Sequence, residues 1–155
     1  MTVEEFVKEI PKLVDQAKLI AKDAFDEPIE LSTDISDIEK LDYIVSYSRK
    51  LRLKGLIDDH VAWNLSVSLG TVLGEMMIKE NGYHWYMNKN DIPVVGPDEE
   101  RCASPITKIE KILNSEEDDE GSPSSFYNSW LALCKYYAMS DEEKEKITET
   151  IYIDE

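Results

Sequence analysis

The segment that most constrains the fold lies between Asp59 and Glu80, where apolar residues recur at helical spacing. Two adjacent faces of the expected helix are apolar, with Ala62, Leu65, Leu69, Leu73 and Met76 on one and Trp63, Val67, Gly70, Gly74 and Met77 on the other. A helix that is apolar over most of its circumference usually lies at the centre of a fold. Asp58 or Asp59 can cap its start, and Asn81-Gly82 is a stop signal.

Gly70 and Gly74 lie one turn apart on this expected helix. Small residues at that spacing let another backbone approach a helix closely, which favours tight packing against a helix or a sheet. No Lys-Ser or Lys-Thr pair follows them, so they are not part of a phosphate-binding loop. The sequence therefore predicts that other elements pack directly on these glycines.

Local start signals predict further helices on both sides of the central one. Thr2 and Glu5 form a capping box before an amphipathic segment that reaches Ala24, and Pro11 should bend or restart that helix. A second capping box, Ser36 and Glu39, opens a helix that ends at Gly55. Later helices are expected after the N-cap pairs Ser104-Pro105 and Ser122-Pro123, and after the capping box of Ser140 and Glu143.

A change of period after Gly82 predicts a small sheet. The aromatic run YHWYMN, a polar turn at Lys89-Asn90-Asp91 and the run IPVV favour a β-hairpin, with a third short strand near 101–103. Pro93 places the second strand at a sheet edge or at a strand start. Residues 151–153 are expected to add a terminal strand or to fray. Together these elements predict a helix-rich α+β fold, residues 1–155 forming a single domain with a central apolar helix packed on a small antiparallel sheet.

The chain carries 33 acidic and 17 basic residues, which give a formal net charge of −16. Such a field repels nucleic-acid phosphates and anionic lipids and attracts basic surfaces. We therefore expect a basic protein as partner, and neither a nucleic acid nor a membrane. The alternative is that the acidic excess serves only solubility.

The N-terminal residues do not resemble a leader. Acidic residues begin at Glu4, and no apolar run approaches the ~20 residues that span a bilayer. We expect a cytoplasmic protein on this basis. Cys102 and Cys134 are too few for a disulfide framework and have no zinc-ligand spacing, so both thiols are expected to be reduced.

A polar stripe on the central helix is the first candidate site. Its members are spaced four, four, three and four residues apart and therefore share one face: His60, Asn64, Ser68, Thr71 and Glu75. Small, nearly uncharged polar residues indicate either a ligand-binding groove or a shielded structural face. Glu75 is the best candidate for a general acid or base, and alternatively it caps the hairpin backbone or pairs with Arg101 or a lysine.

The second candidate site would bind a partner protein. It comprises an acidic loop together with aromatic residues expected to be exposed: Glu116, Glu117, Asp118, Asp119, Glu120, Tyr83 and Tyr86. The loop lacks the ligand spacing of a calcium site, and the two histidines, His60 and His84, are not placed together by spacing. No catalytic residue, metal site or cofactor is predicted.

One stretch resembles a pattern in a group of small bacterial proteins of undefined role. The pattern covers roughly residues 60 to 113, and it comprises Leu69-Gly70, Leu73-Gly74-Glu75, Gly82, Trp85, Ile92-Pro93-Val94-Val95 and Ser104-Pro105. In such proteins an LGxxLGE helix runs into a Trp-bearing hairpin and then into a short helix that starts at proline. Some of them resemble immunity proteins of bacterial toxin systems. The resemblance implies the architecture, and no catalytic residue carries over.

These features favour three functional classes. The leading hypothesis is an acidic, non-enzymatic binding protein, in its most concrete form an immunity or inhibitor protein that neutralises a basic toxin or nuclease. The second is a small enzyme or small-molecule binder that uses the stripe from His60 to Glu75. The third is a scaffold module, for example a homo-oligomer that associates through its aromatic helices.

Overall fold

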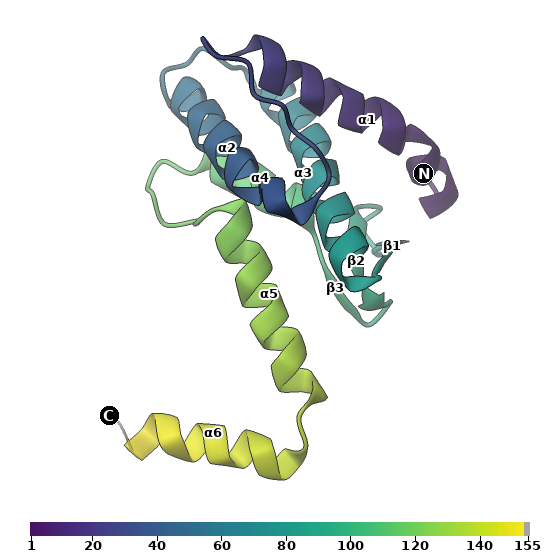
Figure 1. Cartoon of the computed structure of the whole chain (residues 1–155), viewed down its shortest axis with the longest axis vertical. Helices are drawn as coiled ribbons and strands as arrows, with labels where there is room; N and C mark the ends of the chain where they lie inside the picture. The colour runs from purple at the N-terminus through teal and green to yellow at the C-terminus, as the bar shows by residue number, and fades with distance from the viewer. Residues whose placement is uncertain (154–155) are drawn as a thin grey trace.

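A computed structural model describes residues 1–153, and the side chains of residues 1–147 (Figure 1). The elements run in the order α1 (Val3–Asp23), η1 (Ile35–Asp37), α2 (Ile38–Leu53), α3 (Asp59–Asn81), β1 (His84–Met87), β2 (Pro93–Asp98), β3 (Arg101–Ala103), α4 (Pro105–Asn114), α5 (Pro123–Ala138) and α6 (Asp141–Ile153). This is the α+β fold that the sequence predicts, with helices outnumbering the strands of one small sheet.

α3 is the central helix. Asp58 caps its start by accepting a hydrogen bond from the Val61 amide at 2.8 Å, and Gly82 ends it in the left-handed conformation at φ 70°. Helices α1, α2 and α4, together with β1 and β2, all contact it. Its inner residues Leu69, Leu73 and Met76 are fully buried, and burial of such side chains is the main stabilising term of the fold.

α3 also satisfies, by length and composition alone, the criteria for a helix that could cross a membrane, and it is the one helix in residues 1–153 that does so. The expectation that no segment reaches that length was therefore too strict. However, 67% of its most apolar window is buried inside the protein. The core helix of a soluble protein passes the same test, so the match is weak evidence for a membrane span.

Both glycines of α3 are sites of close approach, as predicted. A Cβ at Gly70 would lie 2.6 Å from the Cα of Ile106, so the start of α4 packs directly on the α3 backbone. A Cβ at Gly74 would overlap the ring of Trp85 in β1 and touch Val95 in β2. The glycine pair therefore positions a helix and the sheet against the same central element.

The sheet is antiparallel with strand order β1-β2-β3. β1 pairs with β2 through His84 opposite Gly96, and β2 pairs with β3 through Val95 opposite Ala103. Pro93 is the first residue of β2, so the strand-start alternative is correct and the edge alternative is wrong, because β2 is the middle strand. In the turn between β1 and β2, Asp91 adopts a left-handed φ of 58°.

Three predictions at element ends need correction. Pro11 lies inside one uninterrupted helix, so α1 does not restart there. The capping box of Ser36 and Glu39 does not form, because Asp34 caps the 3₁₀ turn η1 and α2 begins at Ile38 after that turn. Residues 151–153 are the last turn of α6 and not a strand.

Two arginines of α2 donate hydrogen bonds to the end of α4 and to the loop before α3. Arg49 donates to the Ser115 carbonyl at 3.1 Å, and Arg52 donates to the Asn114 side chain at 3.3 Å and to the Ile57 carbonyl at 2.8 Å. Carbonyls at a helix C-terminus lack partners within the helix, so cationic donors stabilise that end. Arg49 and Arg52 therefore have a structural role.

α5 is attached to the body of the molecule over its first turns. Asp42 of α2 accepts hydrogen bonds from the amide and the hydroxyl of Ser124, at 2.8 and 2.5 Å. Tyr127 is buried, and its hydroxyl accepts a hydrogen bond from Asn81 of α3 at 3.0 Å, whereas the end of α5 and α6 extend away from the other helices (Figure 1). Leu133, Tyr136 and Tyr137 are consequently exposed on α5.

Candidate functional site

The polar stripe does not form one continuous groove. His60 and Asn64 are exposed at the start of α3. Nε2 of His60 lies 3.3 Å from Nδ2 of Asn64, within hydrogen-bonding distance. Farther along, Ser68 is buried and donates to Gln16 of α1 at 3.2 Å, while the Thr71 hydroxyl donates to the Val67 carbonyl. Ser68 and Thr71 are thus satisfied within the packing of α3.

Glu75, at the end of the stripe, lies beside the sheet. The indole N–H of Trp85 donates to its carboxylate at 3.4 Å. Arg101, which the sequence offered as a partner for Glu75, instead pairs with Asp98 at 2.7 Å. The structure therefore gives Glu75 a contact with the hairpin through a side chain, and not through the hairpin backbone.

The acidic loop of residues 116–120 is mostly exposed and partly tied to the body. Two ion pairs connect it: Oδ1 of Asp118 lies 4.0 Å from Nη1 of Arg49, and Oε2 of Glu120 lies 3.4 Å from Nζ of Lys108. Asp119 accepts a hydrogen bond from the Ser115 hydroxyl. Glu116 and Glu117 remain on the surface with no side-chain partner in the described residues.

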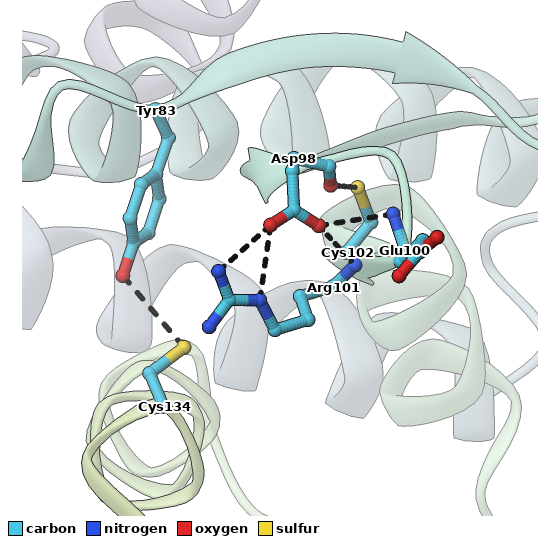
Figure 2. Close-up of polar contacts among 6 residues, drawn as sticks. All are labelled: Tyr83, Asp98, Glu100, Arg101, Cys102 and Cys134. Atoms are coloured by element: carbon cyan, nitrogen blue, oxygen red, sulfur yellow. Dashed lines mark hydrogen bonds and ion pairs between the residues drawn. The ribbon is translucent and has the colours of Figure 1, made fainter. Parts of the chain in front are cut away.

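Tyr83 is not the exposed aromatic residue that the sequence led us to expect. Its ring points toward α5, and the hydroxyl contacts the Cys134 sulfur at 3.9 Å (Figure 2). Burial, followed by the contact with Cys134, raises the pKa of Tyr83 to about 12. Tyr86 is also half-buried, with its ring 6.4 Å from that of His84. The aromatic side chains with larger exposed fractions are elsewhere, at Tyr43, Trp63 and Tyr137.

Figure 2 also shows how the β2–β3 turn is held beside this contact. Asp98 accepts from the Arg101 guanidinium and from the backbone amides of Glu100 and Arg101. The hydrogen bond from the Arg101 side chain lowers the pKa of the Asp98 carboxyl. The Cys102 thiol donates to the Asp98 carbonyl at 2.9 Å, and burial raises its pKa to about 11. A thiol of that pKa is protonated at neutral pH and is a poor nucleophile.

A groove of about 630 Å³ lies between α1, α3 and the hairpin turn, and we call it the α1–α3 groove. Its lining is mainly apolar and comes from four separate parts of the chain: Met1, Glu5, Phe6, Lys8, Glu9, Leu13, Trp63, Val67, Asp91, Ile92, Pro93 and Ile106. None of the five stripe residues lines it. Its volume is in the range of pockets that bind ligands or side-chain anchors, ~300–1,000 Å³.

The groove has a buried apolar floor and a partly exposed wall. Phe6 and Ile106 are buried and form the floor, whereas the Trp63 ring on the wall is 45% exposed. A half-exposed tryptophan beside a concave apolar surface is typical of a protein-binding hot spot. The groove is therefore the described surface with the clearest binding geometry.

The rim of the groove is acidic. Glu5, Glu9 and Asp91 contribute three carboxylates, whereas Lys8 contributes the one cationic side chain among the lining residues. Among the side chains of residues 1–147, none forms a hydrogen bond or an ion pair with these carboxylates. They are free to pair with cations of a bound molecule.

No protein-family model, curated protein or solved structure matches this chain. The resemblance to small bacterial proteins with an LGxxLGE helix therefore stays a prediction. Among the described residues, no group of three or more His, Cys, Asp or Glu side chains could hold a metal ion.

Sequence reasoning missed the α1–α3 groove because its parts are far apart in the chain. The one local signal was the second apolar face of α3, which carries Trp63 and Val67 beside the fully buried face. A second apolar face that neighbouring elements only partly cover must line either a groove or an interface. That face, and not the polar stripe, leads to the site.

Proposed function

We propose that the protein is an acidic, non-enzymatic binding protein that receives a basic segment of a partner protein in the α1–α3 groove. The observation that carries the proposal is the combination of an apolar floor at Phe6 and Ile106 with free carboxylates on the rim. Apolar side chains of the partner would pack beside Trp63, and its lysine or arginine residues would pair with the rim.

Electrostatics supports a basic partner over an acidic or neutral one. The whole chain carries a formal charge of −16, and the rim has three carboxylates against one lysine. Long-range attraction of this kind accelerates encounter and selects the sign of the partner, while the buried apolar contact sets the lifetime of the complex. Binding should therefore weaken with salt without vanishing.

The most concrete form of this function is an inhibitor or immunity protein that neutralises a basic toxin or nuclease. A protein that binds nucleic acid must present a positive surface, and an acidic protein seated on that surface blocks the substrate. Occlusion needs no catalytic group on the inhibitor. In this form the partner's basic segment in the groove would belong to its substrate-binding surface.

The test compares capture of partners from the native cell lysate by four forms of the protein, at low and at moderate salt, with mass spectrometry of what is retained. Beside the wild type, the variants are Trp63→Ala in the groove, the rim triple Glu5→Gln/Glu9→Gln/Asp91→Asn, and the loop double Glu116→Gln/Glu117→Gln. Asn tolerates the left-handed backbone at position 91, so the rim variant should keep the turn.

We expect the wild type and the loop variant to retain the same basic protein, and the groove and rim variants to lose it. The purified partner should then bind the Trp63→Ala variant at least tenfold more weakly, which is the usual loss at a hot spot. A partner that is lost with the loop variant and kept by Trp63→Ala would move the site to residues 116–120. The proposal would be refuted by a captured partner that is acidic, or by one whose affinity is the same at low and at moderate salt.

Self-association is a second candidate function, favoured by one observation on α5. Leu133, Tyr136 and Tyr137 are exposed on a helix that projects from the body (Figure 1). Exposed apolar residues grouped on one helix are typical of a helix–helix interface. Sedimentation velocity over a range of protein concentrations tests it, and a monomer at all concentrations would exclude a scaffold built through α5.

A further inference from the structure

A second, smaller pocket lies on another part of the surface, between the loop after α1 and the middle of α2. Its volume is about 400 Å³, and it is lined by Phe25, Asp26, Glu27, Ile29, Tyr43 and Tyr47. We call it the Phe25 pocket. None of its residues belongs to the α1–α3 groove, so a ligand in the Phe25 pocket would be independent of the proposed function.

Three aromatic rings gather at this pocket. Tyr43 and Tyr47 lie one turn apart on α2 and therefore share a face of that helix. The Phe25 ring lies 4.8 Å from the Tyr47 ring at an interplanar angle of 53°, and 5.5 Å from the Tyr43 ring at 41°. The Phe25 ring is thus tilted against both tyrosine rings, and it does not stack face to face with either of them.

Packing explains only part of this cluster. Phe25 and Ile29 contact the hydrophobic core and close the end of α1. Tyr43, in contrast, is 57% exposed, although a large aromatic side chain loses stabilisation when it stays in water. Neither tyrosine hydroxyl has a hydrogen-bond partner in residues 1–147, where side chains are described, so hydrogen bonding there does not account for the choice of tyrosine.

The charged groups at the pocket are all acidic. Asp26 and Glu27 are exposed, and neither side chain has a hydrogen bond or an ion pair in the described part of the chain. No lysine or arginine lines the pocket. The nearby Lys40 is occupied, because its ammonium pairs with Asp37 at 3.2 Å and donates to the Glu30 carbonyl at 2.9 Å.

We infer that the Phe25 pocket binds an organic cation, namely an alkylated ammonium or guanidinium group. The electron-rich faces of the rings attract such a cation, and the carboxylates of Asp26 and Glu27 supply the balancing negative charge. A methylated ammonium or a guanidinium is weakly hydrated, so it can leave water and contact the rings.

Other ligand classes fit the same pocket less well. An anion would meet two carboxylates with no cation to oppose them. A hard metal ion takes about six or more oxygen ligands and keeps its water, which two exposed carboxylates do not provide. A neutral apolar ligand would gain the contact with the rings but would make no use of the charge.

The cation can come from two sources, a free small molecule such as choline or a side chain of a partner protein. The chemistry of recognition is the same for both. If the source is a protein, the Phe25 pocket would add a second contact point for a basic partner, separate from the α1–α3 groove.

The test is a titration followed by NMR of the backbone amides and the aromatic rings. The probes are choline, its neutral carbon isostere, and two otherwise identical short peptides that carry either trimethyllysine or unmodified lysine. We expect choline and the trimethyllysine peptide to shift resonances of Phe25, Tyr43 and Tyr47 saturably, and the isostere to shift them far less.

Two variants at the pocket separate the contributions. Tyr43→Leu keeps apolar volume and removes the ring, and Asp26→Asn/Glu27→Gln removes the charge without changing shape. Each should weaken choline binding about tenfold, as expected for loss of a cation–π or a paired charge contact. Tyr86→Leu is the matched control, because it removes another partly exposed aromatic ring that lies outside the pocket and outside the α1–α3 groove, and it should leave choline binding unchanged.

Three results would overturn the inference. Two of them are equal binding of choline and its neutral isostere, and the lack of a saturable shift with any probe. The third is binding of choline that survives both pocket variants, because the site would then lie elsewhere. If the trimethyllysine peptide binds more tightly than free choline, the source is a protein side chain, and the reverse order identifies a small molecule.

Discussion

The α-carbon of Gly74 faces the indole ring of Trp85, and there is no room for a methyl group between them. A Cβ built at Gly74 would lie 2.5 Å from Cζ2 of that ring and 3.2 Å from a methyl carbon of Val95. The same indole packs edge-on against Phe6 at 4.9 Å and donates to Glu75. A single missing side chain on α3 thus allows the sheet, α1 and α3 to meet at one ring.

This contact predicts that Gly74→Ala destabilises the protein. Alanine improves helix propensity by about 1 kcal/mol, but overpacking a core typically costs about 1–3 kcal/mol, and here the ring is held from two sides. We expect a net loss of up to about 2 kcal/mol in urea unfolding. Gly74→Ala/Trp85→Phe should lose less than the sum of its two single variants, because the smaller ring makes room. Additive losses would contradict the contact.

The elements of the fold that sequence could predict are those fixed by short-range bonds. The caps at Asp58, Ser104 and Ser122 each join residues three apart, so the signal and the structure lie in the same few residues. The capping box at Ser36 failed because Asp34 bonds the Ser36 amide and Asp37 bonds Ser32, which favours a 3₁₀ turn over an earlier helix start.

The candidate sites were less predictable because they are assembled from distant segments. The α1–α3 groove joins the first turns of α1 to Trp63, to the hairpin turn and to Ile106. The sequence also did not predict which aromatic side chains are exposed, since Tyr83 turns inward to Cys134 while Tyr43 stays exposed. Spacing on a helix shows which residues share a face, but only tertiary packing decides which faces remain open.

The attachment of α5 to the body predicts a local effect at Asp42. Its carboxylate accepts two hydrogen bonds from Ser124 at the start of α5, where the helix dipole also favours a negative charge. Asp42→Ala should cost about 1–2 kcal/mol, the usual loss when an acceptor side chain at a helix N-terminus is replaced by alanine. Amides of α5 should then exchange with solvent faster than those of α2. Glu39→Ala on the same helix is the control, and uniform acceleration across the protein would contradict a local role.

Acid should destabilise the loop before α2 through Asp37. Hydrogen bonds from Ser32 to its carboxylate, at 2.7 and 2.8 Å, lower the pKa of Asp37 below its ordinary value. A carboxyl whose pKa is lower in the folded state contributes stability above its ordinary pKa, and that stability is lost as pH falls through the lowered pKa.

The corresponding variant is Asp37→Asn. It should lower the free energy of unfolding at neutral pH by about 1 kcal/mol, the usual net contribution of an intramolecular hydrogen bond. The gap between variant and wild type should narrow as the pH falls below about 4. Urea unfolding across the pH range measures the gap, with the exposed Asp15→Asn as control. A gap that stays constant in acid would show that the Asp37 charge is not responsible.

Alkali should act at a different place in the molecule, through Tyr83. Its pKa is raised from 10.0 to about 12, chiefly by burial and then by Cys134, so the folded protein holds this proton more tightly than the unfolded chain does. Stability from Tyr83 is therefore complete below pH 10 and is lost as pH rises toward 12.

Tyrosinate absorbance should show Tyr83 among the last of the eight tyrosines to ionise. Tyr83→Phe should remove that late step and flatten the alkaline loss of stability, whereas Tyr137→Phe, at an exposed ring on α5, should leave both unchanged. A late step that persists in Tyr83→Phe would mean that the raised pKa belongs to another tyrosine.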